Sequence, residues 1–195
     1  GNDLSAISKV MSVRNELGAK RQIFFVTIGG WDMHDNLLDG LNGRLPQVSQ
    51  ALKAFYDSTV ELGIADNVTT FTISDFARTI TSNGKGSYHA WGGNSMVMGG
   101  AVKGGKIYGS YPRMSVDNYD RNVSNRGHYI PALSTDELYA ELALWYGVSS
   151  YDLCYVLPNL GNFYSYAPNN YPVGFMDFEG TTVSSDNKPQ GCTTY

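Results

Sequence analysis

The chain is short of charge and of long hydrophobic runs, and each shortage excludes a class of protein. Only 16% of its 195 residues are charged, against about 25% in a typical soluble protein. The net charge is −4 and no cluster of Lys and Arg occurs, so a nucleic-acid partner is not expected. No hydrophobic run approaches the roughly 18 residues of a membrane-spanning helix, and no basic-then-apolar signal segment opens the chain.

Cysteine is also scarce, and its spacing argues against a zinc-binding pair. The two cysteines are Cys154, in an apolar stretch, and Cys192, in a polar tail. Cys154 fits a small core residue. A disulfide from Cys154 to Cys192 would instead tie the tail to the body in an oxidising compartment, and both interpretations stay open.

The remaining composition is typical of a globular protein with an unusually polar, uncharged surface. Hydrophobic residues make up 42%, and 22 Gly and 14 Tyr accompany many Asn, Ser and Thr residues. A single domain of this length buries roughly 70% of the surface of its unfolded chain. We expect one domain over residues 1–176, followed by an appended polar tail over residues 177–195.

Hydrophobic periodicity and turn residues predict an α/β fold with a mostly parallel sheet flanked by helices. Residues 22–28 and 68–73 read as buried strands joined by a helix, which makes them parallel neighbours with a right-handed crossover. A capping box, Ser134 with Glu137, opens a helix that ends near Tyr146. The other expected elements are helices over residues 4–17, 46–62 and 150–157, strands over 95–98 and 106–108, and irregular chain over 79–93 and 110–133.

Acidic and imidazole side chains follow both predicted strands. Asp32, His34 and Asp35 come after the first strand, and Asp75 comes directly after the second. Because ligands of open α/β sheets bind beyond the carboxyl ends of the strands, we expect one shared site there. This pattern indicates a metal-dependent hydrolase.

Asp32 and His34 are two residues apart, so in extended backbone both side chains point to the same side and could reach one ion. A carboxylate with a neutral imidazole suits zinc, manganese or iron better than calcium. The alternative is a polar turn in which Asp32 caps backbone amides. Arg78 could bind an oxyanion of the substrate in bidentate fashion, or could pair with Asp75.

Several ordered segments resemble a bacterial domain-of-unknown-function family, number 1501. The resemblance covers about residues 4–176, and its main motifs are Gly29-Gly-Trp-Asp-Met-His-Asp-Asn36, Val68-Thr-Thr-Phe-Thr-Ile-Ser-Asp-Phe-Ala-Arg78, His89-Ala-Trp-Gly-Gly93 and Met98-Gly-Gly-Ala-Val-Lys-Gly-Gly-Lys-Ile-Tyr-Gly109. Family members look like relatives of alkaline phosphatases and sulfatases and are generally exported, to the periplasm or beyond. The resemblance thus implies an alkaline-phosphatase-like core that is incomplete in this chain.

The resemblance also implies a set of site residues. Asp32, His34 and His89 would hold one divalent ion, zinc or manganese, and Asp75 would hold a second. Family members are typically longer, so the chain resembles a carboxyl-terminal half. The upstream half would then be its partner and would supply the nucleophile.

The chain departs from the family pattern where further metal ligands are expected. Tyr88 precedes His89 where an Asp is usual, and Asn94-Ser95 replaces two histidines. Tyr and Asn are poorer ligands for transition metals. Two functions therefore stay open: an exported scaffold or surface-assembly protein that self-associates and has a degenerate site, and a metal-dependent phosphoric- or sulfuric-ester hydrolase.

Overall fold

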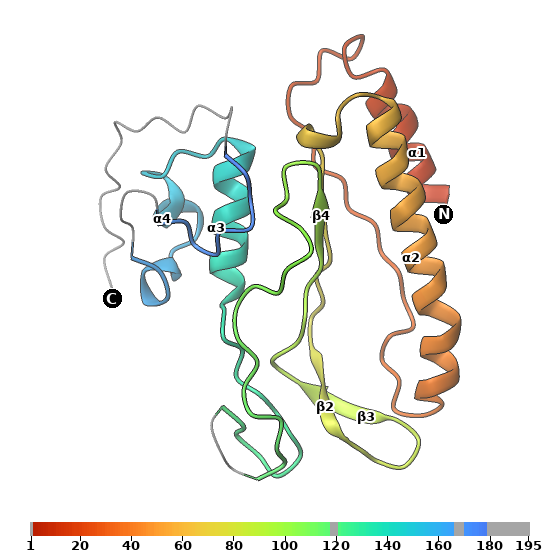
Figure 1. Cartoon of the computed structure of the whole chain (residues 1–195), viewed down its shortest axis with the longest axis vertical. Helices are drawn as coiled ribbons and strands as arrows, with labels where there is room; N and C mark the ends of the chain where they lie inside the picture. The colour runs from red at the N-terminus through yellow and green to blue at the C-terminus, as the bar shows by residue number, and fades with distance from the viewer. Residues whose placement is uncertain (1, 118–120, 166–169, 179–195) are drawn as a thin grey trace. The chain divides into compact units, whose positions relative to one another are not determined.

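The structure is a computed structural model that describes residues 2–117, 121–165 and 170–178. The chain divides into two compact units (Figure 1). Unit 1 comprises Gly1–Gly100 and Met114–Ile130, and unit 2 comprises Ala101–Arg113 and Pro131–Tyr195. Cys192 and the predicted tail from residue 179 onward lie outside the described residues. None of the described helices is both long enough and apolar enough to cross a membrane.

Unit 1 contains two helices that pack against each other, α1 (Asn2–Ser12) and α2 (Leu37–Glu61). Their shared core consists of Met11, Phe55 and Ile64, all buried, with further apolar side chains packed around them. The short 3-10 helix η1 (Ala65–Asn67) follows α2. Gly63, which lies just beyond α2, is in the left-handed region, and glycine tolerates this positive φ without steric cost.

The helix α2 begins nine residues earlier than the sequence suggests, at Leu37 instead of Pro46. Proline favours the first turn of a helix because it lacks an N–H donor, yet here Pro46 lies inside the helix. Tertiary contacts support the additional turns. The Leu37 N–H donates to the Lys85 carbonyl at 3.0 Å, and the buried Met33 side chain lies against Gly40, where a Cβ would meet its sulfur at 2.7 Å.

The predicted parallel sheet is wrong, and with it the alkaline-phosphatase-like core. The described strands form two separate antiparallel pairs. β1 (Thr69–Phe71) pairs with β4 (Val97–Gly99), and β2 (Ala77–Ser82) pairs with β3 (Ser87–Ala90). The second predicted strand is therefore real but short, and its partner comes from later in the chain.

Residues 22–28, the predicted first strand, run as a loop (Figure 1) and belong to neither of the strand pairs that the structure describes. The backbone of residues 22–29 makes no hydrogen bond with any described residue. Its apolar side chains also stay in solvent: Ile23 is 82% exposed and Phe25 is 76% exposed. The apolar run is thus present without the pairing that would make it a buried strand.

In unit 2, α3 (Thr135–Tyr146) is the principal helix, and the predicted capping box is present at its start. The Ser134 side chain accepts from the Glu137 N–H, and the Glu137 carboxylate accepts from the Ser134 N–H at 2.8 Å. Two short elements follow, α4 (Leu153–Val156) and η2 (Leu160–Asn162). Residues 106–108, a predicted strand, are not in a strand, whereas Val102 forms an isolated antiparallel bridge with Met176.

A fully buried carboxylate holds the end of unit 2 against α3. Glu141 is 0% exposed, and it accepts hydrogen bonds from the N–H groups of Val173 at 2.7 Å, Gly174 at 2.5 Å and Met176 at 2.7 Å. Three backbone donors that would otherwise be buried without a partner are therefore satisfied by one side chain.

We expect Glu141→Gln to destabilise unit 2 by roughly 2–5 kcal/mol, because an amide NH2 group cannot accept from the backbone donors that the carboxylate oxygen satisfies. Denaturant unfolding measures this free energy, and hydrogen exchange at residues 173–176 should rise with it. Glu137→Gln on the same helix is the matched control, since a capping box also accepts Gln. Equal stability of the two variants would contradict the structural role of Glu141.

Candidate metal centre

Two segments of unit 1 supply the candidate site: the loop before α2 and the β2–β3 hairpin. Asp32 and His34 lie on the loop, which makes a sharp turn at Gly30 with φ of +85°. Arg44 fixes this turn from α2, where its Nε donates to the Gly30 carbonyl at 2.7 Å. The loop therefore reaches the site with its backbone held from the helix side.

The hairpin brings Arg78 and His89 together because its register places them opposite each other on neighbouring strands. Side chains that face each other across an antiparallel pair lie on the same side of the sheet. The connecting turn contains Asn83 and Gly84, and Gly84 has φ of +97°. Asn-Gly between two strand-forming stretches is a strong hairpin signal, so the sequence did contain the information that residues 79–93 are not simply irregular.

The hairpin turn also holds the backbone around His34. Asn83 Nδ2 donates to the His34 carbonyl at 2.9 Å, and the Ser87 N–H donates to the Met33 carbonyl at 3.3 Å. Gly86 lies so close that a Cβ there would be 2.4 Å from the Met33 oxygen and 2.5 Å from the His34 carbonyl carbon. Only glycine leaves room for this approach.

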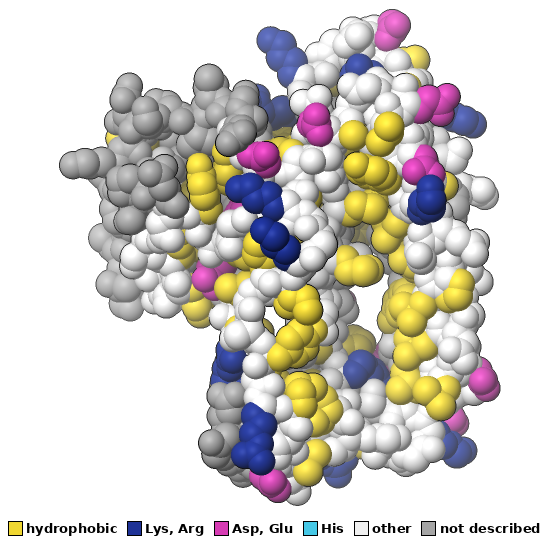
Figure 2. Space-filling view, viewed as in Figure 1, with side chains coloured by type: hydrophobic (Ala, Val, Ile, Leu, Met, Phe, Trp, Pro, Cys, Tyr) yellow, Lys and Arg dark blue, Asp and Glu magenta, His cyan; other side chains and the backbone are white. Residues whose placement is uncertain are grey.

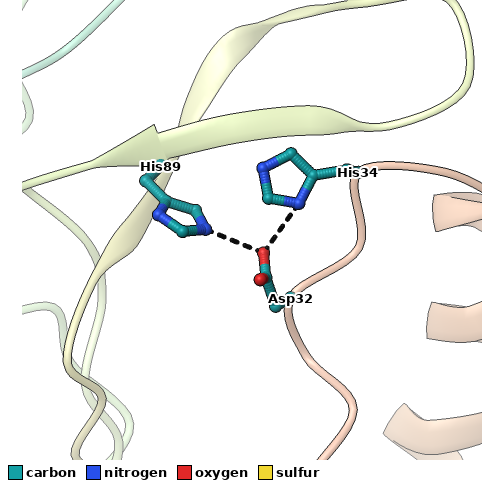
Figure 3. A group of neighbouring side chains, drawn as sticks. All are labelled: Asp32, His34 and His89. Atoms are coloured by element: carbon teal, nitrogen blue, oxygen red, sulfur yellow. Dashed lines mark hydrogen bonds and ion pairs between the residues drawn. The ribbon is translucent and has the colours of Figure 1, made fainter.

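These segments bring Asp32, His34 and His89 into one group (Figure 3). Asp32 Oδ1 lies 2.9 Å from His34 Nδ1 and 2.8 Å from His89 Nε2. All three side chains are about half exposed. One potential ligand atom from each residue lies within 4.8 Å of the other two. Among the described residues, this group has the composition and closeness that a metal ion requires.

Ring contacts orient the imidazole groups. The Phe76 ring stacks on His89 with centroids 4.0 Å apart and planes 21° apart. The His34 and His89 rings lie 4.9 Å apart, and the Tyr88 ring meets His34 edge-on at 6.0 Å. Tyr88 therefore supports the group through its ring.

Arg78 ties the group to the hairpin. Its Nη1 donates to Asp32 Oδ1 at 2.5 Å, its Nε donates to Ser87 Oγ at 3.1 Å, and its Nη2 donates to the Ser87 carbonyl. The expected alternative partner, Asp75, is not the acceptor. Ser87 was missed in the sequence because a lone serine on an unrecognised strand carries no signal.

The charge of Asp32 is stabilised by these partners. Hydrogen bonds from His89 and Arg78, with a further contribution from the nearby His34, hold the pKa of the Asp32 carboxyl below its usual value. An ionised carboxylate can only accept, so in the hydrogen bond between Asp32 Oδ1 and His89 Nε2 the hydrogen lies on the imidazole nitrogen. That hydrogen must leave Nε2 before the nitrogen can bind a metal ion.

The residues present fit a divalent transition metal. Zinc lies about 2.0–2.2 Å from imidazole nitrogens and carboxylate oxygens, which in tetrahedral geometry places ligand atoms roughly 3.3 Å apart. Asp32 Oδ1 lies 2.9 and 2.8 Å from the two imidazole nitrogens, and the three ligand atoms lie within 4.8 Å of one another, so the side chains would have to adjust to surround one ion. Two imidazoles and one carboxylate suit zinc, iron or manganese.

The fourth predicted metal ligand lies outside this group. Asp75 is exposed and is not among the three residues that come together. Asp35 points to the hairpin turn instead, where its Oδ2 lies 3.7 Å from Lys85 Nζ. The described residues therefore offer one group for a single ion.

A family model described as "Protein of unknown function (DUF1501)" matches residues 5–130 of the chain. The match includes every member of the candidate site, and the chain belongs to this family. No curated protein and no solved structure shows significant similarity to the chain.

We expect Arg78→Gln to raise the pKa of Asp32 towards its ordinary value, because the variant loses the charged donor to Oδ1. The sign follows from the lowered pKa: the hydrogen-bonded group persists at pH values above that pKa and is lost as the pH falls through it. In Arg78→Gln the loss therefore starts at higher pH. Carboxyl ¹³C NMR titration measures the shift, and Arg14→Gln, which removes a cation that bonds the Met11 carbonyl in α1 instead, should leave it unchanged.

Proposed function

We propose that the chain carries the metal centre of a hydrolase that acts on phosphoric or sulfuric esters. The observation that supports this is the convergence of one ligand atom each from Asp32, His34 and His89 within 4.8 Å. These residues come from two segments more than fifty positions apart in the sequence. A polar turn after a strand, the simpler interpretation of Asp32 and His34, would not need His89 beside them.

The number of ligands and their exposure favour a catalytic centre over a structural one. Structural zinc sites are closed by four protein ligands, whereas catalytic sites have three and keep a position open for water or substrate. This group has three residues, each about half exposed. Solvent and a substrate can therefore reach the centre.

The charges near the centre favour an anionic substrate. A divalent ion with ionised Asp32 and Arg78 carries a net charge of about +2. The guanidinium of Arg78 is the side-chain type that recognises phosphate and carboxylate groups best. Phosphoric and sulfuric esters are anions, and they match this charge.

Each of the chain's own residues would have a distinct role at the metal centre. His34 and His89 would bind the ion through the nitrogens that now face Asp32, and Asp32 would bind it through a carboxylate oxygen. Arg78 would keep the carboxylate oriented through its bond to Oδ1, as the outer partners of metal ligands do. The ion itself would polarise the ester and activate the attacking water.

Location and partner follow from the family resemblance. The proposal places the protein outside the cytoplasm, in the periplasm or the medium. It also assigns an upstream part of the same protein as a partner that can complete the substrate site, including any nucleophilic side chain.

We expect the full chain to bind about one zinc or manganese ion, and His89→Ala to weaken that binding at least tenfold, because one of three ligands is lost. Isothermal titration calorimetry and elemental analysis measure affinity and stoichiometry. Binding should weaken as the pH falls, since the ion competes with protons for the ligands.

His128→Ala is the matched control for this experiment. His128 is the third histidine, and it contacts Ser124 outside the metal-binding group. Its removal should leave the affinity unchanged. A wild-type chain that binds neither ion, or a His89→Ala variant that binds as tightly as the wild type, would overturn the proposed centre.

The exposed backbone of residues 22–29 favours a second function, that of an assembly component. Eight consecutive residues, rich in apolar, β-branched and aromatic side chains, have backbone donors and acceptors that no described residue pairs. Such a segment can add a strand from another chain. Figure 2 shows further hydrophobic side chains exposed along α2, and Leu38, Leu45 and Val60 are among the exposed residues of that helix.

We expect Phe25→Lys to abolish any concentration-dependent association of the chain, because a charge in the added strand opposes pairing. Sedimentation velocity measures the association. Ile107→Lys is the matched control, since Ile107 is exposed to the same extent, 76%, as Phe25 and belongs to unit 2. Association that is absent in the wild type, or unaffected by Phe25→Lys, would count against the assembly function and leave an upstream strand of the same protein as the partner of this segment.

A further inference from the structure

A pocket of about 340 Å³ lies in unit 1 beside the candidate metal centre. Its walls come from the loop before α2, from the first turns of α2 and from the hairpin strands. Its apolar lining includes Trp31, Leu37, Leu41, Phe76 and Ile80. The volume is at the lower end of the range for small-molecule sites, which suits one ring better than a large ligand.

The pocket and the metal centre share residues. Arg78 lines the pocket and donates to Asp32. Phe76 lines the pocket and stacks on His89. Trp31 lines the pocket and is followed directly by Asp32. A ligand with an anionic group at the centre would therefore have its attached group at the pocket.

The hydroxyl groups that line the pocket are already engaged in hydrogen bonds. Thr79 Oγ1 donates to the Thr81 carbonyl and accepts from the Tyr88 N–H. Ser82 Oγ donates to the Gly86 carbonyl and accepts from the Gly84 N–H. Ser74 Oγ donates to the Phe76 carbonyl. The wall consequently offers a ligand mainly apolar contact, despite its serines and threonines.

We propose that this pocket receives the organic group of the substrate and selects esters with a flat apolar group, such as an aryl ring, over alkyl esters. The inference rests on the proposed metal-dependent ester hydrolase and specifies its substrate class. The aromatic side chains of Trp31 and Phe76 favour a ring, because rings gain from stacked or edge-on contacts beyond their buried area. Arg78 at the boundary then faces the anionic group.

The test compares phenyl phosphate with methyl phosphate as ligands of the full chain. Both carry the same anionic group, so the ratio of their dissociation constants isolates the contribution of the pocket. We expect phenyl phosphate to bind about tenfold more tightly, since a buried ring contributes at least one decade of affinity. Calorimetry with and without zinc gives the ratio and, in the same samples, the zinc stoichiometry.

Two substitutions on α2 localise the effect. Leu41→Phe adds volume inside the pocket and should lower the preference for phenyl over methyl phosphate by about threefold or more, while methyl phosphate binding stays unchanged. Leu45→Ala is the matched control, because Leu45 lies four residues along the helix, is exposed and does not line the pocket. It should leave the ratio unchanged.

The outcomes separate the two proposals. Zinc binding with a phenyl-to-methyl ratio near one, or a ratio that Leu41→Phe does not alter, overturns the pocket and leaves the metal centre intact. A chain that binds neither zinc nor manganese overturns the hydrolase. A tenfold preference for phenyl over methyl phosphate that persists without zinc, and that Leu41→Phe removes, supports the pocket. In that case Arg78 alone supplies the positive charge that faces the phosphate group.

Discussion

The close approach of the β2–β3 turn to the loop before α2 is the constraint on which the candidate site depends. Gly86 lies against the backbone of Met33 and His34, where any side chain would overlap main-chain atoms. Around this contact, Asn83 and Ser87 bond the loop carbonyls, and Leu37 at the start of α2 bonds the turn. These contacts fix His34 relative to the strand that carries His89. Without these contacts, His34 would not be held close to His89.

The same contact places Asp32 where it has three polar partners. Its Oδ1 atom faces His34, His89 and Arg78 at hydrogen-bonding distance. Such an atom is poised in two ways, because it can serve as an acceptor in a hydrogen-bonded group or as a ligand to an ion. Arg78 and a bound metal ion would both carry positive charge beside Asp32. Asp32 can therefore serve as a metal ligand next to Arg78 only if an anion balances these charges, and for this reason the arrangement suits an anionic substrate.

Asp32, His34 and His89 lie together, but not for the reason that the sequence argument gave. That argument placed Asp32, His34 and Asp75 at the carboxyl ends of two adjacent parallel strands and took His89 from the family resemblance, whereas residues 22–28 form no strand and both sheets are antiparallel. Instead of parallel strands, the register of the β2–β3 hairpin, in which Arg78 lies opposite His89, brings the site residues together. Asp75 depended on the parallel arrangement most directly, and it does not join the group.

The sequence by itself determined the features whose signals are local: the capping box at Ser134 and the helix that runs from there to Tyr146. These depend on hydrogen bonds and packing within a few residues or along one helix face. Tertiary structure alone decided the pairing of β1 with β4, the early start of α2 and the burial of Glu141 under residues 173–176. Each joins distant segments, and the free energy of such contacts depends on partners that no local pattern specifies.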